Sequence, residues 1–180
     1  MVDSSLEAEI KKFAHSIHGT VTFSESGRIK RDNQYDIQTE NESIQLIWGN
    51  QPEMGRGVYV TTQSIFSFKL KEGSNTILKI YPRDFLSTLF SIFDSNRSKT
   101  GNPQLDKSYF FVTDDSNLLN SIEPFLKDFN QNNKFQSFVM DVRNGDDGKK
   151  LFTIQINDSV SNEKDLSFLY KFGKRVAEKL

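Results

Sequence analysis

The side chains that most often carry out enzyme chemistry are scarce in this chain. It has no cysteine and only two histidines, His15 and His18. Thiolate nucleophiles and cysteine-containing zinc sites are therefore excluded, and histidine acid–base catalysis would have to use one of these two residues. Both fall near the end of a predicted helix, off its apolar face and close to Lys11 and Lys12. Because like charge nearby disfavours a bound cation, we interpret this region as a solvated helix end and predict no metal site.

Carboxylates are the remaining groups with catalytic capacity. Asp114 and Asp115 stand between a predicted strand and a predicted helix, where aspartate serves as an N-cap. Asn144–Gly148 has too few oxygen ligands, at the wrong spacing, for a calcium loop and is predicted to be a turn. Hydrolytic chemistry would require a deep pocket into which Asp106, Asp114 or Asp141 projects. The sequence contains no glycine-rich phosphate loop and no nucleophile elbow, and we expect no cofactor.

Aromatic residues are plentiful, with 16 phenylalanines in 180 residues, and most of them are predicted to form the core. Two places fit recognition. The single tryptophan, Trp48, precedes a loop with Met54 and Arg56, and these residue types are enriched at interfaces. The alternative there is a long hairpin loop with its tryptophan folded into the core. In the last helix Phe168 and Phe172 fall outside the main apolar face, so they either widen the buried arc or face a partner.

Alternation of apolar and polar residues predicts that much of the chain is β-strand. The clearest strand runs from Val58 to Leu70, and a turn at Gly73–Asn75 leads to a hairpin partner, Ile77–Tyr81. Tyr109–Val112 is apolar on both faces, which predicts a central strand. The other predicted strands are shorter alternating runs: 20–24, 35–37, 44–48, 138–142 and 152–156.

Apolar residues at helical spacing predict helices over five segments: about 4–19, 82–93, 114–123, 124–129 and 162–180. Pro124 is predicted to begin the fourth of these helices, because proline is tolerated in the first turn of a helix but not in its interior. The polar segment from Asp94 to Gln104, which contains Gly101 and Pro103, is predicted to be a surface loop.

The order of elements is α-β(4-5)-α-β-α-β-β-α, without a serial βαβ pattern. This order predicts an α+β fold, with a largely antiparallel sheet and helices packed on one face. The length fits a single domain, residues 1–180. A net charge of −1 and a pI near 6.1 provide no overall field for nucleic acid or an anionic membrane. No apolar run approaches the ~18 residues of a membrane span and no signal-peptide pattern is present, so we expect a cytoplasmic protein.

From about Val58 to Asp115 the chain resembles a loose group of uncharacterised bacterial α+β proteins. The group shares a Gly-x4-Asp-x2-Phe-x-Val-x2-Asp-Asp segment, which corresponds here to residues 101–115, with Tyr109-Phe110-Phe111 at the aromatic position. The resemblance implies a bacterial origin and an α+β fold, and it implies no catalytic residues.

Together these observations favour a non-catalytic binding or protein-interaction module whose partner is an unknown protein or a second copy of the chain. The alternative is a small-ligand carrier or a carboxylate-dependent hydrolytic enzyme with an aromatic-lined pocket. Nucleic-acid binding ranks last, because acidic residues are as common as basic ones. The predicted binding residues are those of the two aromatic places: Trp48, Met54, Arg56, Phe168 and Phe172.

Overall fold

The computed structural model of the chain describes residues 4–26, 31–52, 58–74, 76–83, 97–132, 134–135, 138–158 and 160–180. Within these residues the helices are α1 (Ser4–Ser16), α3 (Pro103–Ser108), α4 (Ser116–Asn132) and α5 (Glu163–Ala177). The strands are β1 (Thr20–Ser26), β2 (Arg31–Gln38), β3 (Glu42–Pro52), β4 (Val58–Lys69), β5 (Leu78–Pro82), β6 (Arg97–Ser98), β7 (Tyr109–Thr113), β8 (Phe138–Asn144) and β9 (Lys150–Ile156).

The nine strands form one antiparallel sheet in the order β1-β2-β3-β4-β9-β8-β5-β7-β6. The predicted α+β class is therefore confirmed. Contacts within the chain divide it into two compact units, which are described separately. Unit 1 comprises residues 1–67 and 155–171, and unit 2 comprises residues 68–154 and 172–180. None of the helices in the described part of the chain is long and apolar enough to cross a membrane.

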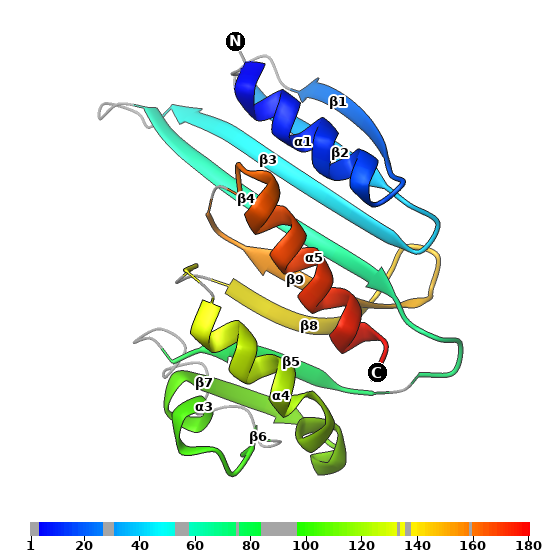
Figure 1. Cartoon of the computed structure of the whole chain (residues 1–180), viewed down its shortest axis with the longest axis vertical. Coiled ribbons are helices and arrows are strands. Elements are labelled where there is room, and N and C mark those ends of the chain that lie inside the picture. Colours follow the sequence, from blue (N-terminus) through cyan, green and yellow to red (C-terminus); the bar gives the residue numbers. More distant parts are fainter. Residues whose placement is uncertain are drawn as a thin grey trace. The chain divides into compact units, whose positions relative to one another are not determined.

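In unit 1, α1 lies against one face of β1 and β2 (Figure 1). Its buried Phe13 meets the ring of Tyr170 in α5, with ring centroids 5.9 Å apart. Across the strands Phe23 of β1 is paired with Tyr35 of β2, and Tyr35 is paired with Leu46 of β3. Tyr35 and Leu46 are buried, whereas Phe23 is 49% exposed. The apolar row therefore runs from the core to the first strand of the sheet.

The end of α1 is a solvated helix terminus, as predicted. His18 takes a left-handed conformation with φ of 55°, and the amide of Gly19 donates to the carbonyl of Ala14 at 2.9 Å. This pattern closes the last turn of a helix. The side chains of His15 and His18 are both exposed.

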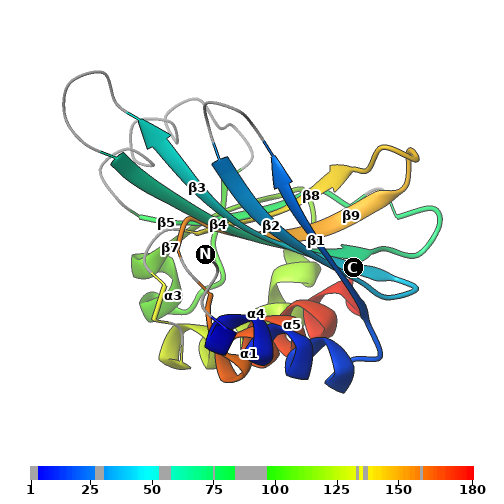
Figure 2. The same cartoon turned by 90° about the horizontal axis from the view of Figure 1, so that it is seen from above.

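In unit 2, α4 lies on one face of β5, β7 and β8 (Figure 2). The hydroxyl of Tyr109 in β7 bonds to the side chain of Asn130 in α4 at 2.8 Å. Phe138 of β8 packs edge-on against Phe129 of α4, at a centroid distance of 5.2 Å. Since side chains alternate along a strand, the neighbours of Tyr109 and Phe138 in sequence lie on the opposite face of the sheet.

The predicted hairpin between Val58–Leu70 and Ile77–Tyr81 is wrong. β5 pairs with β7 on one side and β8 on the other, whereas β4 lies between β3 and β9. The residues of β5 explain this arrangement, because Ile80 and Tyr81 are both buried although they point to opposite faces. Burial on both faces is typical of a strand in the interior of a sheet, and β5 has a paired strand on each of its edges.

Two further predictions need correction. α4 is one helix with Pro124 in its interior, rather than two helices that meet there. Leu118, Ile122 and Phe129 form one continuous buried stripe, so burial of that stripe outweighs the hydrogen bond lost at the proline. The predicted loop over residues 94–104 contains β6 and the start of α3, which Asn102 caps. Most of the predicted helix over residues 82–93 lies outside the described residues.

Candidate functional site

The structure describes little of the first predicted recognition site. Trp48 lies in β3, where its backbone is paired with Asn33 of β2. The side chain of Trp48 and the whole of Met54 and Arg56 are outside the described residues. Their role in binding therefore stays a prediction.

The second predicted site is the pair of phenylalanines in α5. Phe172 is buried at 4% exposure, with its ring 4.6 Å from that of Phe129. Phe168 is half-buried. Burial of Phe172 agrees with the alternative in which the last helix has a wide buried arc, and it leaves Phe168 as the more accessible member of the pair.

The three carboxylates considered for hydrolytic chemistry each have a structural partner. Asp141 accepts a hydrogen bond from the hydroxyl of Thr153, and Asp114 accepts one from the amide of Ile77 at 3.4 Å. Asp106 accepts three hydrogen bonds, which are described below. Within the described residues no group of three or more metal-ligating side chains is present. Asp115 caps α4, since its carboxylate accepts from the amide of residue 117 at 2.8 Å, as predicted.

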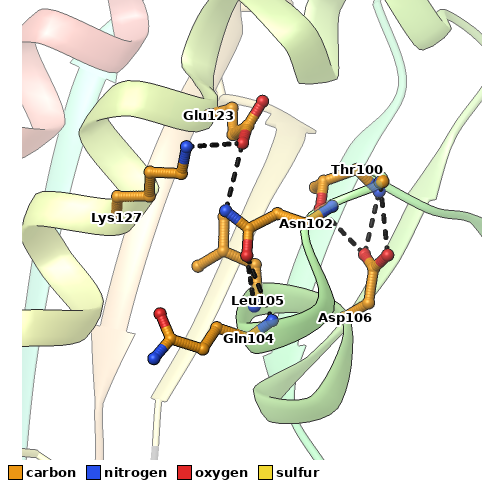
Figure 3. Close-up of polar contacts among 8 residues, drawn as sticks. Thr100, Asn102, Gln104, Leu105, Asp106, Glu123 and Lys127 are labelled. Atoms are coloured by element: carbon orange, nitrogen blue, oxygen red, sulfur yellow. Dashed lines mark hydrogen bonds and ion pairs between the residues drawn. The ribbon is translucent and has the colours of Figure 1, made fainter.

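Asp106 holds the chain between β6 and α3 in place (Figure 3). One carboxylate oxygen accepts from the amide and the hydroxyl of Thr100, at 2.9 and 2.8 Å, and the other accepts from the amide of Gly101 at 3.2 Å. Beside it, Asn102 caps α3 and also donates to Glu123 of α4 at 3.2 Å. Because every donor is local backbone or a nearby side chain, this network is structural, and it fixes the residues that follow β6.

Glu123 links the network to the middle of α4. Its carboxylate also bonds to Lys127, one turn further along the helix, at 2.9 Å (Figure 3). The hydrogen bonds from Lys127 and, to a smaller extent, from Asn102 hold the pKa of Glu123 below its usual value. At neutral pH Glu123 is therefore charged, and it ties α4 to the N-terminus of α3.

A shallow cleft of about 260 Å³ lies between the turn after β4 and the turn before β9. Its lining includes Lys71, Glu72, Lys149 and Lys150, and we call it the lysine cleft. Lys149 lies 3.8 Å from the carboxylate of Glu72, so part of its positive charge is balanced. The volume is below the 300–1,000 Å³ that is usual for small-molecule sites. None of the three carboxylates considered for hydrolysis lines this cleft.

A separate apolar cluster lies on the face of the unit 2 sheet that is opposite α4. Tyr81, Phe110 and Val112 are buried there, at 8%, 4% and 6% exposure, and Val139 packs against them. Tyr81 of β5 is paired with Phe110 of β7, and their rings are 5.5 Å apart. These apolar side chains form an apolar patch in the middle of this sheet face.

Two arginines lie over this apolar patch. The guanidinium carbon of Arg83 is 4.0 Å from the centroid of the Phe110 ring, and that of Arg97 is 4.9 Å from the same centroid. Such distances give cation–π attraction, which keeps each planar group against the ring. Both arginine side chains are exposed. We call this surface the arginine face and define it by Lys79, Tyr81, Arg83, Arg97, Phe110, Val112 and Val139.

Arg83 is anchored by two hydrogen bonds to the backbone of neighbouring described residues. Its backbone amide donates to the carbonyl of Ser108 at 2.9 Å, and its side-chain Nε donates to the carbonyl of Tyr109 at 3.1 Å. An arginine has five N–H donors, so the four on its two terminal nitrogens remain. None of the described residues accepts a hydrogen bond from those four. The two terminal nitrogens of an arginine can donate in parallel to the two oxygens of a carboxylate.

Arg175 in α5 shows the more usual arrangement for comparison. Its guanidinium carbon lies 4.4 Å from the ring centroid of Phe125, a distance similar to that of Arg83 from Phe110. However, Arg175 also has a counter-charge, since it lies 3.7 Å from the carboxylate of Asp128. Neither Arg83 nor Arg97 has a carboxylate within ion-pair distance in the described part of the chain.

Lys79 is a third cation of the arginine face. Lys79 and Arg97 are paired with Val112 from its two sides, so they lie in one row across β5, β7 and β6. Lys79 also lies 5.7 Å from the ring centroid of Tyr81. On its other side Lys79 is paired with Asp141, whose carboxylate bonds to Thr153. Positive charge therefore exceeds negative charge on the described part of this face.

Sequence reasoning missed the arginine face for identifiable reasons. Lys79 and Tyr81 of β5 alternate with apolar residues, and Arg83, directly after β5, continues this spacing. The sequence pattern nevertheless places Arg83 at the start of a predicted helix. Arg97 falls in a segment that was predicted to be a loop, and no periodicity marks a strand of two residues. The partner ring, Phe110, is distant in the sequence from both of them.

Comparison of the chain with protein-family models, with curated proteins and with solved structures found no match.

Proposed function

We propose that the chain is a non-catalytic binding module and that the arginine face recognises an acidic segment of a protein partner. The observation that supports this most strongly is the pair Arg83 and Arg97. Both guanidiniums lie over the single ring of Phe110, and no carboxylate of the described residues balances them. Charged groups of one sign that are held together without a counter-charge provide a ready site for an external anion.

The chemistry of the face favours an acidic peptide over a nucleic acid. Nucleic-acid-binding domains usually combine high pI with a basic stripe that contacts many phosphates, whereas this chain has a net charge of −1. Ile77, which precedes β5, is 47% exposed and adds apolar contact area that a peptide side chain can cover. A bidentate pair between arginine and carboxylate also gives orientation as well as attraction. The bacterial origin and the cytoplasmic location of the protein stay predictions.

Binding of a labelled peptide of about ten Asp and Glu residues to the full chain tests the proposal by fluorescence polarisation. We expect Arg83→Gln/Arg97→Gln to weaken the affinity at least ~10-fold, which corresponds to about 1.4 kcal/mol. Arg83→Lys keeps the charge and loses the planar fork, so we expect it to weaken binding several-fold.

The matched control is Arg175→Gln/Lys171→Gln, which removes the same two charges from α5 and should leave the affinity within about twofold. The proposal is wrong if both double variants weaken binding equally, because net charge alone would then account for the effect. Tighter binding of a single-stranded oligonucleotide of equal charge would also contradict it and would favour nucleic acid.

A further inference from the structure

β1 is the first strand in the order of the sheet, and among the described strands only β2 is paired with it. Its seven residues, TVTFSES, include no lysine, arginine or proline, and the one charged residue, Glu25, lies near the end of the strand. Natural edge strands are protected from pairing by such residues, by bulges or by being very short. The strand at the other end of the order, β6, has two residues and carries Arg97.

The side chains of β1 add an exposed apolar contact. Phe23 is 49% exposed, although one side of its ring lies 5.0 Å from the ring of Tyr35 in β2. Val21 is half-buried and shares the same strand face. Thr20, Thr22 and Ser24 are exposed, so the opposite face of β1 presents hydroxyl groups.

This sequence is complementary to itself when two copies run antiparallel. A two-fold axis at Thr22 places Thr22 opposite Thr22 of the second copy, Val21 opposite Phe23, and Thr20 opposite Ser24. Each apolar residue then meets an apolar residue, each hydroxyl meets a hydroxyl, and no charged residue lies within the paired run. Pairs of aromatic with β-branched residues, and of threonine with threonine or serine, are favourable across antiparallel strands. An axis at Phe23 instead places Val21 opposite Glu25.

We propose that two copies of this chain associate through β1, antiparallel and with the two-fold axis at Thr22. The association extends the sheet by main-chain hydrogen bonds and covers Phe23 with Val21 of the other copy. Because only one short strand from each copy contributes, the dimer forms reversibly in the micromolar range. This association is independent of the arginine face, which lies on other strands.

Sedimentation velocity of the full chain over about a hundredfold range of micromolar concentration tests the proposal. We expect a monomer–dimer equilibrium whose dissociation constant rises at least ~10-fold in Thr22→Lys and in Thr22→Glu, because each variant brings two like charges together at the axis. An equimolar mixture of the two variants should restore the dimer, since lysine then meets glutamate. Circular dichroism of each variant verifies that it is folded.

A chain that remains monomeric over the whole range would overturn the proposal. So would a dimer that Thr22→Lys and Thr22→Glu leave unchanged, or one that each variant weakens without rescue in the mixture. Phe23→Ser removes the apolar pair without adding charge and should weaken the dimer by a smaller factor.

Discussion

At the scale of single residues, Arg83 and Arg175 have the same kind of aromatic support but differ in their charged neighbours. Each guanidinium lies over a phenylalanine ring at a similar distance. Arg175 is also paired with Asp128, so it contributes to packing within unit 2. The Nε–H of Arg83 donates to the carbonyl of Tyr109, and none of the described residues accepts from its other four side-chain N–H groups. We infer that Arg83 is held for a ligand, whereas Arg175 is held for the fold.

Tyr109 is the residue from which we predict a dependence of stability on alkaline pH. Burial raises the pKa of its hydroxyl from 10.0 to about 12. The folded state therefore favours the neutral phenol, and its contribution is fully present below pH 10.0. That contribution is lost as the pH rises from 10.0 to about 12, because the unfolded chain ionises first.

Urea unfolding of the wild type and of Tyr109→Phe between pH ~8 and pH ~11.5 measures this effect. At pH ~8 the variant should be less stable by about 0.5–1.5 kcal/mol, because it loses the hydrogen bond to Asn130. Above pH ~10 the difference between the two proteins should shrink. Lysines titrate in the same range but contribute equally to both proteins. A difference that stays constant over the whole range would contradict the assignment.

At the scale of elements, the structure shows which segments the sequence pattern could identify. β7 was predicted from Tyr109–Val112, whose apolar side chains are all buried, and α1 and α5 were predicted from long helical periodicity. β6 and α3 are too short to show a period. The signals for α3 were present, since Asn102 is a good N-cap and Pro103 suits the first helical turn, but they were interpreted as a loop.

The Asp106 network gives a prediction that separates support of the arginine face from general stability. Asp106→Ala removes three hydrogen bonds that fix residues 100 and 101, directly after β6. We expect a loss of about 1–3 kcal/mol in the free energy of unfolding. Because β6 has two residues, Arg97 should also lose its position, so binding of the acidic peptide should weaken although no arginine is changed.

Asp115→Ala is the matched control for that variant. It removes the cap of α4 and should cost about 1 kcal/mol of stability, while peptide binding stays within about twofold of the wild type. Urea unfolding and fluorescence polarisation on both variants give the comparison. Equal affinities for the two variants would show that the Asp106 network does not position the arginine face.

At the scale of the whole molecule, the order of the predicted elements gave the class of fold but not the strand order or the site. The hairpin predicted between residues 58–70 and 77–81 failed because β5 is paired with β7 and β8, which follow it in the sequence. Periodicity reports burial of a strand and does not identify its neighbours. Net charge was similarly uninformative, since a value of −1 averages over a face where positive charge predominates in the described residues.

We expect an acidic partner to bind at the arginine face and not at the lysine cleft, which is a second cationic surface in the described part of unit 2. An NMR titration of the isotope-labelled full chain with the acidic peptide tests this directly. We expect the largest changes in the side-chain Nε–H signals of Arg83 and Arg97 and in the backbone amides of Lys79 and Val112. Changes concentrated at the lysine cleft, with the Arg83 and Arg97 signals unmoved, would contradict the account.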